Sequence, residues 1–288
     1  MGENIKKPLV HIIMPTYNRV DYVGQAINAV KNQSYKNWKL YIVDDCSIDG
    51  TWQVLASHSH TDNRIQCFRT GRQSGSPVEP RNIAFENIVA NEGDLVAFLD
   101  SDDYWHQWKL DTQIASMIDP VVNLSYHDMM IIYETKFSSE ESRTEQWSRT
   151  ATPYEGDCFR LLLRKNFIPT SSVIARYGAL KHYWPMDSRL LINHDWDLWL
   201  KIAAKFPIKY VNEVLGCLSV PYGESVIKDR HRRRAECRTV VRRWKPHVDS
   251  IWYRRILLYY YLMEVIDVLP QWLQKFIRKW WYSQDKYK

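Results

Sequence analysis

The 288-residue chain carries 39 Lys and Arg against 33 Asp and Glu, a formal net charge of +6, and it is 45% hydrophobic and 25% charged. These proportions are typical of a globular protein and exclude a disordered or fibrous chain. No stretch reaches the roughly 18 apolar residues of a spanning helix. The five cysteines are scattered and form no CxxC pair, which argues against a zinc site or disulfide framework and favours a reducing compartment.

The positive charge is concentrated at the end of the chain. Residues 228–288 contain 16 Lys and Arg against 6 Asp and Glu, a net of +10, so the preceding residues carry about −4. This asymmetry predicts a boundary near residue 225 between an acidic body and a basic, aromatic-rich tail.

The first hundred residues alternate between short apolar runs and amphipathic helical patterns. The apolar runs predict buried strands at 9–14, 40–43, 65–68 and 95–99. The helical patterns between them lie at 21–33, 52–57 and 81–90. This alternation predicts an α/β fold with a doubly wound, mostly parallel sheet.

Polar residues follow three of these strands, at 15–18, 44–45 and 100–103. Ligands of open parallel sheets bind beyond the carboxyl ends of the strands, so we expect the three clusters to border one crevice.

The third cluster contains Asp100 and Asp102, whose spacing puts both carboxylates on one side of an extended chain. Hard oxygen ligands of this kind select Mg²⁺ or Mn²⁺, which commonly bridges to a phosphate. The alternative is a polar turn in which Asp102 or Asp103 caps a helix that begins near Tyr104. Neither a Gly-x-Gly-x-x-Gly fingerprint nor a Walker loop is present, so a bound nucleotide would depend on carboxylates and metal.

Four strings resemble glycosyltransferase family 2, in order and at about the right spacing. They are residues 10–19, which end in Pro-Thr-Tyr-Asn-Arg, and residues 43–51, 81–84 and 98–103. The resemblance is close over 9–110 and looser to about 215. It implies a GT-A fold and inverting transfer of one sugar from a nucleotide-diphosphate sugar, most plausibly a UDP-sugar.

The resemblance also implies roles on the nucleoside side. Pro15, Thr16 and Tyr17 would line the nucleoside pocket. Asp45 would accept a hydrogen bond from the base, with Asp44 beside it at the end of the strand.

Further roles are implied around the diphosphate. Arg81 would approach the base or the diphosphate, and Ser101 would lie on the same donor side. Asp100 and Asp102 would hold Mn²⁺ or Mg²⁺, with Asp102 the more direct ligand and Asp103 in support.

After residue 110 the pattern changes. Strands are predicted at 121–126 and 129–133, a polar loop at 138–152 and a short helix at 159–164. Residues 168–174 resemble the strand that precedes the acceptor side in the family.

A further helix is predicted over residues 193–202, with Asp195 and Asp197 at its start. Acidic residues are favoured there by the helix dipole alone. In the family, however, this position resembles the Glu-Asp motif whose Asp is the catalytic base, and Asp195 matches that base. His194 stands where Glu is usual, and it is either a partner of the base or a solvent-facing residue.

The tail combines basic and bulky apolar residues. Residues 224–245 are rich in arginine, and Lys275, Arg278 and Lys279 interleave with an apolar set at helical spacing. That set is Trp272, Leu273, Phe276, Ile277, Trp280 and Trp281. The pattern favours a helix lying on anionic lipid. Packing onto the body or an oligomer contact is the alternative, and nucleic-acid binding lacks a recognisable motif.

The sequence thus predicts three parts: a nucleotide-sugar-binding half at 1–110, an acceptor half with the base at 111–225, and a basic helical tail at 226–288. We expect a metal-dependent enzyme of the bacterial cytoplasm, peripheral on the inner membrane face, that glycosylates a lipid-linked or cell-surface glycan. The alternatives are a nucleotidyltransferase acting on a sugar phosphate and a non-catalytic module that binds nucleotide-sugars.

Overall fold

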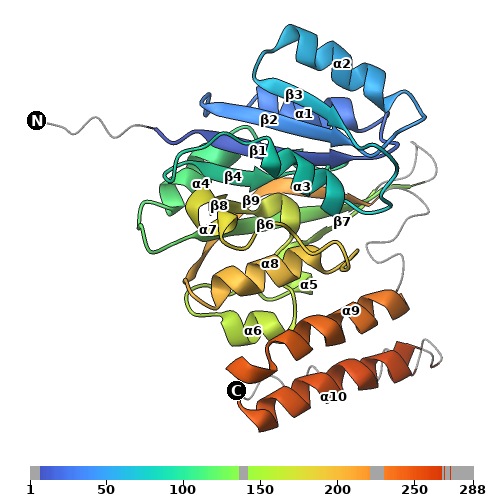
Figure 1. Ribbon diagram of the computed structural model, residues 1–288, viewed down its shortest axis with the longest axis vertical. Helices are drawn as coiled ribbons and strands as arrows, with labels where there is room; N and C mark the ends of the chain where they lie inside the picture. Colours follow the sequence, from blue (N-terminus) through green and yellow to red (C-terminus); the bar gives the residue numbers. More distant parts are fainter. Residues whose placement is uncertain (1–6, 136–141, 221–229, 268, 270–272, 274–288) are drawn as a thin grey trace, which may run out of the picture. The chain divides into compact units, whose positions relative to one another are not determined.

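The computed structural model describes residues 7–135, 142–220, 230–267, 269 and 273 (Figure 1). The chain divides into two compact units, Met1–Ser225 and Val226–Lys288, close to the point where the charge of the sequence changes sign. Within the described residues, no helix combines the length and the apolar character that crossing a membrane requires.

The first half of the larger unit is a parallel α/β layer. Its strands are β1 (Val10–Thr16), β2 (Trp38–Asp44), β3 (Ile65–Arg69) and β4 (Leu95–Phe98), close to the predicted ranges. They pair in the order β3-β2-β1-β4, all parallel. The connecting helices are α1 (Val23–Lys31), α2 (Thr51–Thr61) and α3 (Val78–Glu86).

The second half extends the same sheet with mixed strand directions. Its strands are β5 (Tyr104–Trp105), β6 (Leu124–Tyr133), β7 (Arg143–Gln146), β8 (Ile174–Arg176) and β9 (Ile208–Val220). The order continues β4-β8-β6-β9-β5, with β7 paired to the side of β6. Strand β8 is antiparallel to both β4 and β6, whereas β9 is parallel to β6.

Short helices complete this unit. They are α4 (Lys109–Ser116), α5 (Trp147–Thr150), α6 (Phe159–Arg164), the 3₁₀ turn η1 (Thr170–Ser172), α7 (Tyr177–Lys181) and α8 (His194–Ala203).

Several predicted elements differ from the structure. The helix expected near Tyr104 is wrong, because Tyr104 pairs with Cys217 in the sheet and α4 begins at Lys109. The strand expected at 168–174 contains the turn η1 and only its last residue, Ile174, belongs to a strand, β8. The two strands expected at 121–133 are one strand with an irregular register. Part of the loop expected at 138–152 is β7 and α5. Helix α3 begins at Val78, earlier than expected, since Pro80 in its first turn forfeits no internal hydrogen bond.

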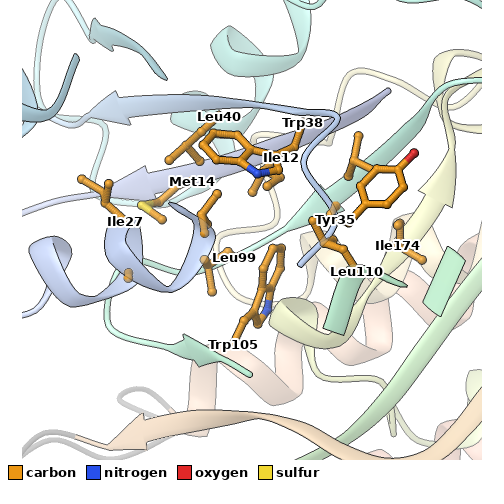
Figure 2. Close-up of a cluster of buried hydrophobic side chains, with 14 of the residues drawn as sticks. Ile12, Met14, Ile27, Tyr35, Trp38, Leu40, Leu99, Trp105, Leu110 and Ile174 are labelled. Carbon is orange, nitrogen blue, oxygen red and sulfur yellow. The ribbon is translucent and has the colours of Figure 1, made fainter. Parts of the chain in front are cut away.

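The main core lies between the sheet and helices α1 and α4. Figure 2 shows Ile12 and Met14 of β1 and Leu99, just after β4, in one cluster with Ile27 of α1 and Leu110 of α4. All five side chains are fully buried. Burying side chains of this size contributes about 1.5–3 kcal/mol each, so this face anchors the strands whose ends carry the polar clusters.

The opposite face of the sheet is covered by α3 and α8. Helix α3 packs on β1 and β2, and Trp199 of α8 packs edge-on against Phe98 of β4 at 5.2 Å between ring centroids. Both helices therefore lie over the same face, although they are far apart in the sequence.

The smaller unit contains α9 (Arg230–Arg243), the turn η2 (Lys245–His247) and α10 (Ser250–Asp267). Helices α9 and α10 pack together through buried Cys237, Val240, Val241, Ile256 and Tyr260. An ion pair between Arg238 and Glu264 also joins them. Of the apolar set predicted between 272 and 281, all but Leu273 lie outside the described residues.

Candidate functional site

The turns that follow β1 and β2 hold each other in place. Asn18 and Cys46 both adopt left-handed backbone conformations, with φ of 47° and 62°, which Asn tolerates better than most residues. The Asn18 amide donates to Ser47 Oγ at 2.9 Å, and Asn18 Oδ1 accepts from the Ile48 amide at 3.0 Å. The carboxyl ends of the two strands thus form one rigid edge.

The predicted nucleoside residues lie along this edge. Pro15 and Thr16 are buried at the end of β1, and the Thr16 carbonyl accepts from the Asp45 amide at 2.8 Å. Tyr17 is exposed, so its ring is available to a ligand.

The two strand-end aspartates are engaged by protein donors. Asp44 forms an ion pair with Arg69, at 3.1 Å from Nε to Oδ2. Asp45 accepts hydrogen bonds from Thr70 Oγ1 at 3.0 Å and from the amides of Ser74 and Gly75 at 2.9 and 3.1 Å. Asp45 therefore organises the loop between β3 and α3, and its contact with a base stays a prediction.

Arg81 contacts Asp100 and His194, so that three predicted site residues are joined. Its guanidinium is almost fully buried; Nη2 donates to Asp100 Oδ1 at 2.5 Å, and Nη1 donates to His194 Nε2. Burial, and then the charge of Arg81, lower the pKa of His194 to about 3. His194 is therefore a neutral acceptor that orients Arg81, and its solvent-facing alternative is wrong because the ring is 4% exposed.

Three carboxylates are crowded after β4. Burial, followed by the charge of Asp100, raises the pKa of Asp102, whose Oδ2 accepts from Arg19 Nε at 3.1 Å. Asp103 is buried and accepts from the Ser219 amide at 3.1 Å. Burial and the two neighbouring carboxylates raise its pKa well above the usual range. Ser101 is also buried, so Asp100 and Asp102 are the more accessible pair.

The donor chemistry of this pair suits a divalent cation. Mg²⁺ is usually held by one or two carboxylates together with substrate phosphates and water, and Mn²⁺ accepts the same oxygen ligands. No group of three or more His, Cys, Asp or Glu is arranged as a metal site among the described residues. Asp100 and Asp102 thus fit a metal that shares its coordination with a phosphate, rather than one enclosed by the protein.

Asp195 lies in the first turn of α8, as predicted. Its Oδ2 accepts from Thr170 Oγ1 at 2.7 Å and its Oδ1 from the Trp196 amide at 2.6 Å, and the side chain remains partly exposed. Since the preceding residue, His194, contacts Arg81, and Arg81 contacts Asp100, the structure brings the predicted base next to the predicted metal ligands.

Sequence reasoning missed three polar contributors. Arg19 was part of a recognised string without a role, and Thr170 and Ser171 were assigned to a strand. Ser171 accepts from the Asp100 amide at 3.0 Å, and thereby holds the loop that carries the metal ligands. Residues 170–172 are three consecutive hydroxyl residues, and buried hydroxyl groups need hydrogen-bond partners, so this string is a signal of a polar turn.

Comparisons with known proteins identify relatives of this chain. The family model described as glycosyl transferase family 2 matches residues 11–183, more than half of the chain. The chain is 29% identical over 197 residues to the UDP-Glc:alpha-D-GlcNAc-diphosphoundecaprenol beta-1,3-glucosyltransferase WfaP of Escherichia coli. The aligned region covers 68% of this chain and 71% of WfaP. The chain spans only 43% of the length of two further curated relatives, to which it is 42% and 39% identical.

Two solved structures are similar in fold. One is the TarS 1–349 fragment of S. aureus in complex with UDP, with a TM-score of 0.64, 19% identity, and coverage of 88% of this chain and 70% of that chain. The other is a mannosyltransferase of Pyrobaculum calidifontis in complex with GDP-Man and Mn²⁺, with a TM-score of 0.61, 15% identity, and coverage of 99% and 82%. At such identities the likeness shows the GT-A type fold alone.

Proposed function

The chain belongs to glycosyltransferase family 2, and we propose that it transfers one sugar from a UDP-sugar to a lipid-linked or cell-surface glycan, with inversion at the anomeric carbon. The observation that carries this proposal is the set of contacts that runs from His194, the residue before Asp195, through Arg81 to Asp100. It joins the helix that bears this carboxylate, in the acceptor half, residues 111–225, to the carboxylates at the end of the donor half, residues 1–110.

In this proposal Asp195 is the general base. It accepts the proton of the acceptor hydroxyl while that oxygen attacks the anomeric carbon and the bond to the nucleoside diphosphate breaks. Thr170 and the Trp196 amide hold the carboxylate by its two oxygens, which fixes its direction. General bases contribute about 10²–10⁴-fold to such steps.

The donor side stabilises the leaving group. Asp102, with Asp100, would hold Mn²⁺ or Mg²⁺, which supplies positive charge to the departing diphosphate when bound. Arg81 adds a fixed positive charge beside Asp100, and Tyr17 offers an exposed ring to the base. The named substrate of WfaP supports a UDP-sugar donor and a diphosphate-linked lipid acceptor as the first pair to test.

The test is a panel of UDP- and GDP-sugars with Mn²⁺ and GlcNAc-diphosphoundecaprenol, scored for nucleoside diphosphate release and glycosylated lipid. We expect Asp195→Asn to lower kcat by about 10²–10⁴-fold without weakening UDP binding, and Asp102→Ala to abolish transfer. Asp62→Asn makes the same change at a surface ion pair with Arg64 and should leave transfer unchanged.

Other products would change the assignment. Release of pyrophosphate from a nucleoside triphosphate and a sugar phosphate would identify a nucleotidyltransferase, and binding of a nucleotide-sugar without turnover of any acceptor would identify a binding module. Full transfer activity in Asp195→Asn would refute the assignment of the base.

We also propose that the smaller unit attaches the enzyme to anionic lipid. Ile251, Leu258, Leu262 and Val265 lie on one face of α10, each between 36% and 66% exposed, with exposed Arg254 and Arg255 on the same face. The acidic residue between 250 and 265, Glu264, is paired with Arg238 of α9. An apolar face that contains arginine and faces solvent is typical of helices at membrane surfaces.

Sedimentation with vesicles tests this attachment. The full chain should sediment with phosphatidylglycerol-containing vesicles and much less with pure phosphatidylcholine, and a Leu258→Glu/Val265→Glu variant should remain in solution. Ile118→Glu changes an 82% exposed apolar residue of the larger unit and serves as the control. Sedimentation of the double variant equal to that of the unchanged chain would refute the proposal, and a dimer in light scattering that the double variant loses would identify an oligomer contact instead.

A further inference from the structure

Both carboxylates assigned to the metal are paired with arginines. Arg19 Nε lies 3.1 Å from Asp102 Oδ2, and Arg81 Nη2 lies 2.5 Å from Asp100 Oδ1. The two arginine side chains differ in exposure, 22% for Arg19 and 3% for Arg81. Arg81 is enclosed between Asp100 and His194, whereas the more exposed Arg19 reaches Asp102 from the turn after β1.

Hydrogen bonds to Asp49 and Thr51 hold the backbone at Arg19 in place. Its amide donates to Thr51 Oγ1 at 2.8 Å, and the next amide, of Val20, donates to Asp49 Oδ2 at 3.1 Å. Thr51 Oγ1 in turn donates to Asp49 Oδ1 at 2.6 Å, so the start of α2 holds the chain on both sides of the arginine. The backbone at Arg19 is thus held by contacts that do not involve Asp102.

A count of formal charges shows what the pairs require of a ligand. Asp100 and Asp102 carry two negative charges, which Arg19 and Arg81 neutralise. Considered without the buried Asp103, these four groups are neutral, so a divalent cation bound among them alone adds an excess of two positive charges. The diphosphate of a nucleotide-sugar carries two negative charges and restores the balance.

We propose that Arg19 is a diphosphate-binding residue that leaves Asp102 for the phosphates when the cation and the donor bind. This inference rests on the proposed function and names a residue through which the donor site couples its two ligands. A guanidinium suits both states, because its donors match a carboxylate and a phosphate in the same two-pronged geometry. Arg19 thus competes with a cation that binds Asp102 alone, and it raises the affinity of the site for a cation that binds together with a diphosphate.

If Arg19 moves from Asp102 to the phosphates, the Arg19→Gln substitution should have opposite effects on the affinity for Mn²⁺ alone and on the affinity for UDP. Loss of the competitor for Asp102 should tighten the binding of Mn²⁺ alone by about 3–5-fold, the size expected for a partly exposed ion pair. Loss of a charged hydrogen bond to phosphate should weaken the binding of UDP in saturating Mn²⁺ by about tenfold or more. Arg19→Lys, which keeps the charge but loses the fork, should change both in the same directions by less.

The experiment uses the full chain. Electron paramagnetic resonance of free Mn²⁺ measures the metal Kd without nucleotide, and calorimetry measures the UDP Kd at saturating Mn²⁺. Arg64→Gln removes the same charge from a surface pair with Asp62 and should change neither Kd. Circular dichroism and thermal unfolding check that each variant is folded.

Opposite changes in the two Kd values, absent in Arg64→Gln, support the exchange. Weaker binding of both ligands, or no change in either, overturns it while the proposed function stands, because the unchanged chain still binds UDP with Mn²⁺. If the unchanged chain binds neither ligand, the donor site and the exchange fall together.

Discussion

Acid pH should destabilise the protein through buried histidines, and replacement of His194 should remove part of that effect. The pKa of His194 is lowered from 6.5 to about 3 by burial and Arg81, and burial also lowers that of His127 to about 3. Each imidazole is therefore neutral in the folded chain but takes up a proton in the unfolded chain below pH 6.5. The contribution of these neutral imidazoles to the free energy of unfolding is therefore fully present above pH 6.5 and is lost as the pH falls toward 3.

The size of the effect follows from the two pKa values. At pH 5.5 the unfolded state gains about 1.4 kcal/mol per histidine relative to the folded state, since one pKa unit corresponds to about 1.4 kcal/mol. Between pH 7.5 and 5.5, the two histidines together should lower the free energy of unfolding by about 3 kcal/mol. His194→Gln, whose amide oxygen can still accept from Arg81, should lose about 1.4 kcal/mol less than the unchanged chain over this interval.

Urea denaturation followed by tryptophan fluorescence at pH 7.5 and 5.5 measures these differences. His182→Gln, at an exposed histidine, is the matched control and should retain the full pH dependence. If the free energy of unfolding falls between pH 7.5 and 5.5 by as much in His194→Gln as in the unchanged chain, the view that His194 is held neutral beside Arg81 is refuted.

Two further predictions concern stability, and urea denaturation measures both. Lys109 is fully buried, Nζ has no hydrogen-bond partner among the described residues, and it lies 3.7 Å from the ring centroid of Trp105. Lys109→Met should raise the free energy of unfolding by about 1–3 kcal/mol; a decrease would show that the contact with Trp105 outweighs the cost of burial. Gly216→Ala should lower it by about 1–3 kcal/mol, because its Cβ would lie 2.6 Å from the Tyr104 carbonyl oxygen. Gly178→Ala in α7 meets only a movable glutamate at close range and should be neutral or stabilising; equal losses in both would contradict this reasoning.

The parallel half was predictable from local patterns. Its strands are short apolar runs that end at polar clusters, and burial on both faces keeps those runs free of interruption. The second half was less predictable because tertiary contacts override local pattern there. Strand β9 contains Asn212, Glu213 and Gly216, and it pairs with β6 across register shifts. No regular alternation therefore marks it as a strand.

The site residues likewise divide into those that local sequence patterns predict and those that depend on tertiary contacts. Asp100 and Asp102 are predicted because they follow a recognisable strand, and Asp195 is predicted because it begins a helix and matches the base of the family. Arg19 and Thr170 act on residues far along the chain, at Asp102 and Asp195, and no local spacing reveals such pairs. The buried, neutral state of His194 likewise depends on Arg81, which lies on another helix.

The position of β4 has a consequence for how this enzyme can be divided. One edge of β4 pairs with β1, and the other is closed by β8 from the second half of the sheet. A fragment that ends near residue 110 would retain β1–β4 but leave the apolar run of β4 with an open hydrogen-bonding edge, which invites pairing with other chains. Residues 1–110 are therefore unsuited to expression on their own, and chimaeras that exchange this segment between related chains should transfer β8 together with β4.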